Sequence, residues 1–183
     1  AYLNTKLPFG FNYKDNDYDI THDNDDQGEH GSHVAGIATA NSWLYGGGDV
    51  FGKALEYAMM QGVAPDAQLL TMKVFGKGGS PYDSDYFAAI EDAIVLGADV
   101  VNLSLGSVAP GRGTHDNAAF EAIMDDLVNS DTVVAISAGN SGPWSEMAEN
   151  YMDLGGTGYL YNTDVSLDTV GQPGSFTNSL AVA

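Results

Sequence analysis

Cysteine is absent from the 183-residue sequence, and basic residues are scarce. The lack of cysteine excludes a disulfide scaffold and a cysteine nucleophile. Only 6 Lys and Arg residues stand against 25 Asp and Glu residues, which gives a formal net charge of -19. A surface of this charge repels phosphate groups, so we expect no nucleic-acid partner and no binding to anionic membrane surfaces.

Long apolar runs are also missing, and none approaches the ~18–20 residues that a membrane-spanning helix needs. The chain does not start with Met, and no basic stretch followed by an apolar stretch marks a signal peptide. We therefore expect Ala1 to lie inside a longer protein. Hydrophobic residues make up 44% of the sequence, which indicates a globular domain or a large part of one.

From residue 68 onward, short apolar runs alternate with stretches that carry apolar residues at helical spacing. This alternation predicts an α/β fold with a parallel sheet. The sheet is expected to be incomplete, because its last strand is cut short by the end of the chain. Before residue 68 we expect a loop with one short strand up to about 29, a helix from 30 to 41, and a loop with a short helix over 42–62. The expected later strands are 68–75, 99–105, 132–137 and 179–183, and the expected helices are 84–96 and 117–128.

Two places in this pattern carry residues suited to catalysis. His30 begins an expected helix, where an imidazole can act as a general base near neutral pH. Asn140 follows the end of the strand over 132–137, and its amide can donate hydrogen bonds into a cleft. Sites in open parallel sheets form beyond the carboxyl ends of the strands. The residues alone therefore indicate a hydrolase-like site that uses His30 and Asn140.

Five segments, in this order, resemble the motifs of the subtilisin-like serine protease family. They are HGSHVAGI (30–37), GVAPDAQLLTMKVF (62–75), GADVVNLSLG (97–106), SAGNSGP (137–143) and TVGQPGSFTNSLAVA (169–183). Five matches in family order and at roughly family spacing argue strongly against chance. The starting segment, AYLNTKLPFGFNYKDND, is similar to the large cell-envelope members of the family, the group of lactocepin and the streptococcal C5a peptidase.

The resemblance implies a subtilisin-like three-layer α/β fold with a central parallel sheet, present here as an incomplete portion. It implies a serine endopeptidase in which His30 is the general base and Asn140 donates to the tetrahedral oxyanion. It assigns 104–106 to a strand that pairs with the substrate backbone, 137–139 to one wall of the primary specificity pocket, and Gly171 to its floor. The expected substrate-binding residues are thus Ser104, Leu105, Gly106, Ser137, Ala138, Gly139 and Gly171.

Two of the family's motifs are not found in these 183 residues. The Asp-Thr-Gly or Asp-Ser-Gly motif of the catalytic aspartate does not occur upstream of His30, and the Gly-Thr-Ser-Met-Ala motif of the nucleophile is absent. Ser175 is a poor substitute, because it lies in the pocket-floor segment. We therefore expect residues 1–183 to be a partial catalytic domain, with the aspartate before residue 1 and the serine after residue 183. The chain alone is expected to be inactive.

Two other functions are left open by the residues. A non-catalytic domain of the same fold would hold a peptide or ions without cutting, and a metal-dependent hydrolase would use His30 with His33. The second is disfavoured, because a third ligand and the HExxH motif are missing. Asp15, Asp17 and Asp19 alternate as in calcium loops, but the glycine of an EF-hand loop is lacking, which favours a solvated acidic surface.

The expected partners are protein or peptide substrates and the remainder of the catalytic domain. We expect no membrane span in this segment, no metal at the catalytic site, and no certain cofactor, with calcium left open. The resemblance implies a secreted protein, extracellular or associated with the cell envelope.

Overall fold

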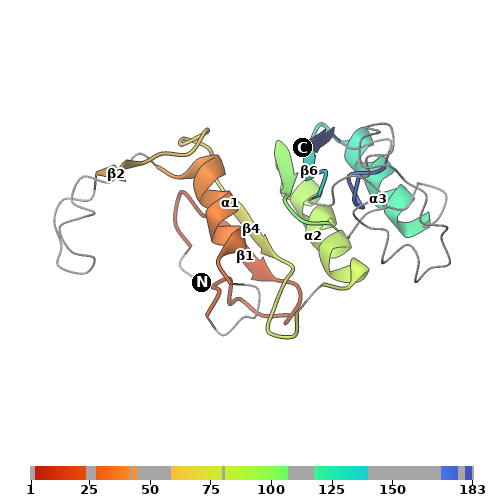
Figure 1. The fold of residues 1–183 in the computed structure, drawn as a ribbon, viewed down its shortest axis with the longest axis horizontal. Helices are drawn as coiled ribbons and strands as arrows, with labels where there is room; N and C mark the ends of the chain where they lie inside the picture. The colour runs from red at the N-terminus through yellow and green to blue at the C-terminus, as the bar shows by residue number, and fades with distance from the viewer. Residues whose placement is uncertain are drawn as a thin grey trace, which may run out of the picture. The chain divides into compact units, whose positions relative to one another are not determined.

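A computed structural model describes residues 3–23, 28–41, 43–44, 59–79, 81–106, 118–139, 170–176 and 180–182 (Figure 1). The chain divides into two compact units, Ala1–Ala89 and Ile90–Ala183. Each unit has its own parallel strand pairing, so the predicted α/β class with parallel strands is confirmed. No helix in the described ranges is long and apolar enough to cross a membrane.

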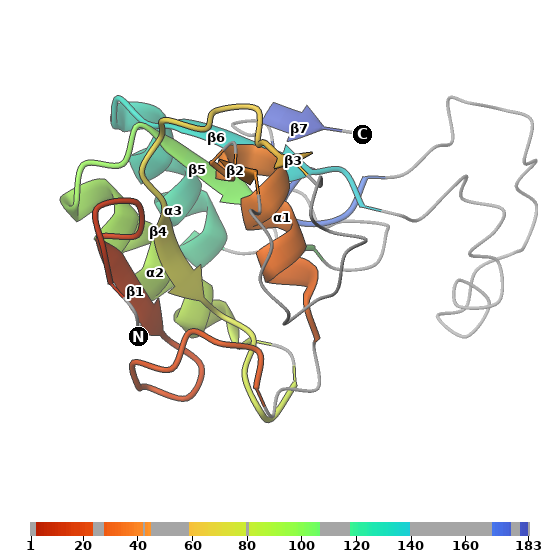
Figure 2. The same ribbon diagram turned by 90° about the vertical axis from the view of Figure 1, so that its left-hand side faces the viewer.

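The first unit contains a parallel pair of strands, β1 (Phe9–Asn12) and β4 (Leu70–Lys73), seen side by side in Figure 2. Their register places Phe9 opposite Leu70 and Asn12 opposite Lys73. Helix α1 (His30–Thr39) lies between them in the sequence. A short antiparallel pair joins β2 (Trp43–Leu44) to β3 (Met59–Met60). The strand at Met59–Met60 corrects the predicted helix there, because backbone pairing with residues 15 and 17 positions earlier cannot be read from local spacing.

The turn after β1 is fixed by a buried asparagine. Asn12 is 1% exposed, and its side-chain amide donates to Asp15 Oδ2 at 3.0 Å while its Oδ1 accepts from Asp15 N at 3.1 Å. The Asp15 carboxylate also accepts from Lys77 N at 3.2 Å. Hydrogen bonding from Asn12 holds the pKa of Asp15 below its ordinary value, against a smaller opposing effect of desolvation. These contacts connect the turn after β1 to the turn after β4.

A lysine connects the same turn to the next helix. Lys14 Nζ lies 3.5 Å from Asp85 Oδ2 and 3.6 Å from the centre of the Tyr82 ring, and only 11% of its side chain is exposed. Asp85 also accepts from Tyr82 N at 2.8 Å, just before α2 (Asp83–Val95) begins. An ion pair this well shielded interacts more strongly than one in water. Lys14 therefore fixes the start of α2 within the first unit.

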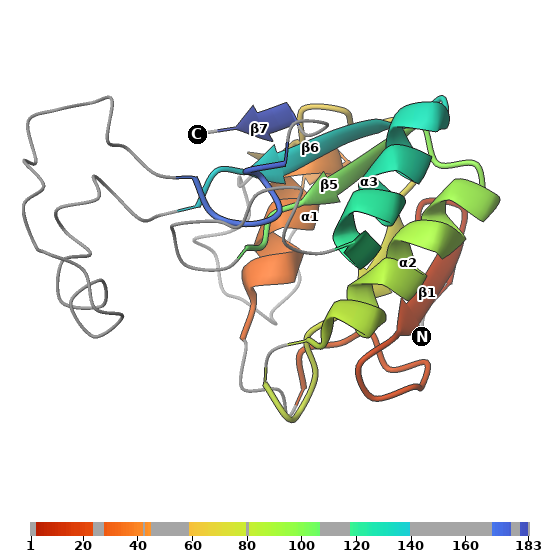
Figure 3. The ribbon, with the colours of Figure 1, turned by 90° about the vertical axis from the view of Figure 1, so that its right-hand side faces the viewer.

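The second unit is built on a parallel sheet of order β5-β6-β7 (Figure 3). Its strands are β5 (Val100–Leu103), β6 (Val133–Ser137) and β7 (Leu180–Val182), and α3 (Ala118–Asn129) connects β5 to β6. One face of the sheet is buried, because alternate residues of a strand point to the same side. The buried apolar residues of this unit are Ile90, Ala93, Leu103, Ile123, Met124, Leu127, Val134, Ile136 and Phe176.

The opposite face of this sheet is apolar but exposed. Val100 and Val133 lie directly opposite one another in the ladder and are 59% and 54% exposed. Leu180 and Val182 of β7 continue this face and are also exposed. Parallel sheets are normally covered on both faces, so the described residues of the second unit cover one face of this sheet and leave the other exposed.

Candidate active site

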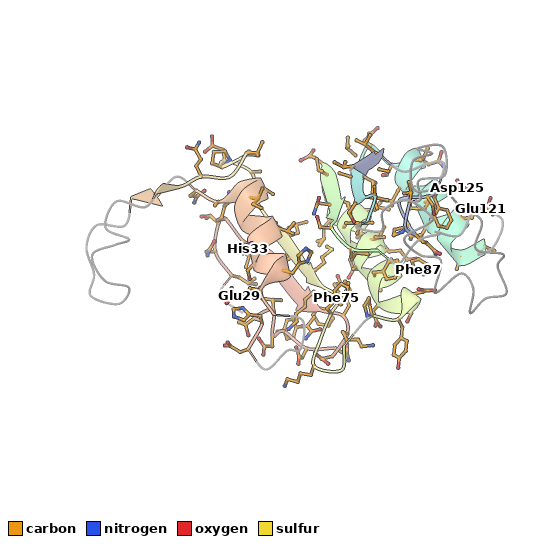
Figure 4. The ribbon with its side chains drawn as sticks, viewed as in Figure 1. Glu29, His33, Phe75, Phe87, Glu121 and Asp125 are labelled. Atoms are coloured by element: carbon orange, nitrogen blue, oxygen red, sulfur yellow. The ribbon has the colours of Figure 1, made fainter. Side chains whose placement is uncertain are left out.

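His30 is the first residue of α1, and it is exposed. Gly28, two positions earlier, has φ of 64°, a backbone conformation that suits glycine. The helix begins without a side-chain cap, and its first hydrogen bond joins His33 N to Glu29 O at 2.9 Å. Figure 4 shows Glu29 and His33 at this end of α1. His30 therefore begins a helix, as the sequence predicts, and the structure presents its imidazole to solvent.

The other end of α1 is held by the backbone of residues 62–64. Gly62 N donates to Ala40 O at 2.8 Å, and the amides of residues 63 and 64 donate to the carbonyls of Ile37 and Ala38 at 2.9 and 2.8 Å. These bonds satisfy carbonyls that the end of a helix leaves without an intrahelical donor. They also require a glycine, because a Cβ at Gly62 would lie 2.5 Å from Ala40 N. The helix that carries His30 is thus fixed at its far end.

The small residues of α1 have open space around them within the first unit. Among its described residues, nothing lies within 4 Å of a Cβ built on Gly31 or Gly36, and no residue of α1 is buried. Ile37 on this helix is 68% exposed.

The neighbouring histidines give no sign of a metal centre. His22 Nε2 lies 3.8 Å from Glu29 Oε1, and both side chains are well exposed. His33 lies one turn along α1 from the helix start and is exposed as well. In the described part of the chain, no group of three or more His, Asp or Glu side chains is arranged to hold a metal ion.

In the second unit, three segments that are far apart in the sequence meet at the carboxyl end of the sheet. Residues 104–106 follow β5, and 137–139 end and follow β6. Ser137 Oγ donates to Leu105 O at 3.0 Å, which joins the first two segments. The third, 170–176, is joined to the second because Gly171 N donates to Ala138 O at 2.9 Å. The structure therefore brings together all of the predicted substrate-binding residues.

The third segment is a tight turn that is largely buried. Its Gln172–Pro173 peptide bond is cis, and Ser175 N donates back to Gly171 O at 3.0 Å. Gly171, Pro173 and Gly174 are buried, and Phe176 is only 2% exposed. Ser175 is thus held in the turn by its own backbone amide.

Glycines allow the three segments to approach one another closely. A Cβ on Gly106 would lie 3.0 Å from Gln172 O, and one on Gly174 would lie 2.9 Å from Ser137 O. Gly139 has φ of 96°, and a Cβ built on it would lie 3.8 Å from Gly171 N. A side chain at Gly106 or Gly174 would press against the backbone of the neighbouring segment, so the arrangement depends on glycine.

Sequence reasoning missed several residues of this arrangement. Gly174, Gln172 and Phe176 were not singled out, although the dense turn residues of the PGSF segment were a usable signal. Asn140, the predicted oxyanion donor, lies outside the described residues. Its position directly after Gly139 is the only constraint that the described backbone provides.

All charged side chains among the described residues of the second unit are acidic. Its charged side chains are Glu91, Asp92, Asp99, Glu121, Asp125, Asp126 and Asp131. Glu121 and Asp125 lie on α3 (Figure 4). A surface of one sign attracts molecules of the opposite charge over long range. Cationic segments are therefore the partners that this field favours.

The sequence matches the model of the subtilase family, Peptidase_S8, over residues 4–183. The chain belongs to the subtilase family. A PI-type proteinase of Lactococcus lactis subsp. cremoris is 49% identical over 109 residues, which span 58% of this chain and 5% of that protein. A C5a peptidase of Streptococcus pyogenes serotype M18 is 39% identical over 82 residues, 44% of this chain and 6% of that protein. The matched part of this subtilase is therefore a small fraction of each relative's length.

A solved structure extends the similarity to the fold. Sphericase matches 82% of this subtilase with a TM-score of 0.50 and 30% sequence identity, and the match covers 37% of the sphericase chain. Together with the parallel pairing of both units, this match confirms the predicted subtilisin-like α/β fold, present here as an incomplete portion.

Proposed function

We propose that this subtilase is the part of a serine endopeptidase that supplies the general base, the oxyanion donor and the substrate-binding strand. The observation that carries the proposal is the meeting of segments 104–106, 137–139 and 170–176 at the carboxyl end of the sheet. In open α/β sheets, this end is where ligands bind. The family match over residues 4–183 supports the same conclusion.

His30 is proposed as the general base. It would accept the proton of the serine nucleophile during attack and return it to the leaving amine. This role requires an imidazole that a substrate can reach, and the exposed position at the start of α1 meets that requirement. The backbone bonds from 62–64 to the end of α1 would hold the helix still while the proton moves.

Asn140 is proposed as the oxyanion donor. Gly139 turns the chain after β6 with φ of 96°, and an amide directly after such a turn can be aimed away from the strand. Charge develops on the carbonyl oxygen only in the transition state, so this donor would act on turnover rather than on binding. Loss of such a donor costs about 10²- to 10³-fold in turnover, a magnitude established with the asparagine of the subtilisin family itself.

The substrate is proposed to lie along residues 104–106 as an added strand. These residues leave the β5–β6 ladder after Leu103, and another chain would pair with their backbone on the edge away from Ser137. The strand at 104–106 and the lack of a side chain at Gly171, on the proposed floor of the pocket, favour a large apolar side chain before the cleaved bond. Acidic surroundings would add long-range attraction for cationic segments of the substrate.

The catalytic aspartate and serine are proposed to come from other parts of the full-length protein, because their motifs do not occur in these residues. The purified 183-residue chain is then expected to hydrolyse no peptide. By its family resemblance, we also propose that the protein acts outside the cell or at the cell envelope. Recovery of the native protein only from the cytosol would contradict this localisation.

The test compares His30→Ala, Asn140→Ala and His22→Ala in the full-length protein with chromogenic peptides. His30→Ala should lower turnover by several orders of magnitude, because the serine loses its proton acceptor. Asn140→Ala should lower turnover by about 10²- to 10³-fold, with little change in KM and an unchanged pH profile. His22→Ala removes an exposed histidine near α1 and should have no effect.

Two results would contradict the proposal. Activity near wild type in His30→Ala would exclude the endopeptidase assignment, and it would favour a non-catalytic peptide-binding domain if peptides still bound. A higher KM with unchanged turnover in Asn140→Ala would make this residue a substrate contact instead of an oxyanion donor.

A further inference from the structure

Strands β5 and β6 are joined beyond both ends of their ladder by a side-chain hydroxyl. Before the ladder begins, Thr132 Oγ1 donates to Ala98 O at 2.9 Å. After it ends at Leu103 and Ile136, Ser137 Oγ donates to Leu105 O at 3.0 Å. Both hydroxyls come from the β6 side, and both acceptors are backbone carbonyls on the β5 side. The two bonds therefore form a matched pair at opposite ends of one strand pair.

The bond at the carboxyl end lies where the two strands separate. Beyond Ile136, the backbone of β6 pairs with β7: Ser137 lies opposite Val182, and Ala138 N donates to Val182 O at 2.8 Å. Regular pairing with β5 has already ended at Leu103. At this point the Ser137 hydroxyl connects the segment 104–106 to β6 through a side chain.

Ser137 also contacts the third segment of the site. Its carbonyl oxygen lies 2.9 Å from the position that a Cβ would take on Gly174. The next residue, Ala138, accepts from Gly171 N. One side of Ser137 therefore faces 104–106 and the other faces the turn at 172–175. The residue is half-buried between them.

We propose that Ser137 is a positioning residue, whose hydroxyl sets the spacing between the substrate-binding strand and the turn at 170–176 through Leu105. The proposal rests on the proposed function, because the spacing matters only if a substrate side chain enters there. It adds to the wall role that the family resemblance implies for this residue.

The consequence is an effect on selectivity. With alanine at position 137, the carbonyl of Leu105 loses this donor and the segment 104–106 can move relative to β6. One net hydrogen bond corresponds to a change of about 3- to 10-fold in an equilibrium or rate constant. Discrimination between a large and a small side chain before the cleaved bond should fall by that factor. A lower fraction of folded enzyme would not change this ratio.

The experiment uses the full-length protein with three variants, Ser137→Ala, Ser137→Thr and Thr132→Val. Two peptides that differ only in Leu or Ala before the cleaved bond give the ratio of their kcat/KM values. Hydrogen exchange with mass spectrometry follows the backbone amides of 104–106 without any need for activity. Ser137→Thr keeps the hydroxyl, and Thr132→Val removes the matched hydroxyl at the opposite end.

Ser137→Ala should lower the Leu/Ala ratio by about 3- to 10-fold and speed exchange in 104–106 by a similar factor. Ser137→Thr should restore both values, and Thr132→Val should change neither. Equal effects of Ser137→Ala and Thr132→Val would overturn the proposal, because general loosening of the sheet would then suffice. A changed ratio without faster exchange would also overturn it, since Ser137 would then contact the substrate directly.

The peptide kinetics and the hydrogen exchange test the proposed function and the positioning role of Ser137 separately. If the wild-type protein cleaved neither peptide, the endopeptidase assignment would fail. Unchanged exchange in Ser137→Ala would still overturn the positioning role, and faster exchange restored by Ser137→Thr would still support it.

Discussion

Replacing Gly62 with alanine is expected to loosen the helix that begins with His30. A Cβ at this position would lie 2.5 Å from Ala40 N, 2.6 Å from Thr39 N and 2.8 Å from Ala38 C. All three atoms belong to the backbone, so no side-chain rotation can relieve the overlap. The segment 62–64 must move away from the end of α1, which strains its three hydrogen bonds to that helix.

The magnitude follows from the two effects together. Overpacking costs about 1–3 kcal/mol, and each backbone hydrogen bond contributes about 0.5–1.5 kcal/mol net. Movement of the segment 62–64 relieves the overpacking but weakens the hydrogen bonds, so the two costs do not add in full. We expect the free energy of opening of α1 to fall by about 2–3 kcal/mol. This corresponds to roughly 30- to 150-fold faster amide exchange. The decisive measurement is hydrogen exchange of residues 30–41 and 62–64 in the full-length protein.

The control is Gly78→Ala in the same unit, where nothing lies within 4 Å of the added Cβ. Its exchange should match wild type. If Gly62→Ala exchanged within twofold of wild type, the contact between Gly62 and α1 would not hold the helix, and the account of how His30 is positioned would be wrong. Turnover of Gly62→Ala should fall with the stability of α1.

Two further predictions concern the turn that follows β1. Hydrogen bonding from Asn12 lowers the pKa of Asp15 in the folded state. The ionised Asp15 carboxylate therefore stabilises the folded protein above the ordinary carboxyl pKa, and this stabilisation is lost as pH falls through the lowered pKa of Asp15. Calorimetry should therefore show a lower transition temperature for Asp15→Ala at pH 6, with the difference shrinking below about pH 4; a constant difference would contradict this. Lys14→Met leaves the shielded Asp85 carboxylate without its cation and should destabilise the first unit by about 1–3 kcal/mol, whereas exposed Lys77→Met should not. Equal transition temperatures for the two lysine variants would show that the ion pair contributes nothing.

Local periodicity predicted the regular elements well because each carries its own signal. The apolar spacing over 84–96 became α2, and the continuous apolar run over 132–137 became β6. The start of α1 at His30 was also predicted. These elements bury apolar residues at the period of their own backbone, so a single segment contains the information.

The end of β5 shows where this information stops. The apolar pattern predicts a strand to residue 105, but the ladder ends at Leu103. The pattern of side chains is the same on both sides of that point. What ends there is the backbone pairing with β6, which continues to Ser137 beside β7 on its other edge, so that Leu105 is reached by the Ser137 hydroxyl. A hydrogen bond across 32 residues has no local signature.

The glycines show the same limit in another form. Gly31 and Gly36 lie next to His30 in the sequence, yet the described residues of the first unit leave open space around both. Gly62, in a stretch without clear periodicity, is the glycine that the helix requires. Close approach of two backbones depends on segments that meet only in the fold, so composition near a motif cannot identify it.

The described part of the second unit's site is built from backbone and small residues. Its segments are joined by the amide of Gly171 and the hydroxyl of Ser137, and glycines allow their backbones to approach one another closely. Under the proposed function, a site of this kind would select by shape, because its walls carry few side chains that could pair with a charged group. Small changes in spacing then act directly on selectivity, as a rigid wall transmits a shift that a flexible side chain would absorb. That is why a single hydroxyl at the point where β5 and β6 separate is expected to alter which residue is accepted before the cleaved bond.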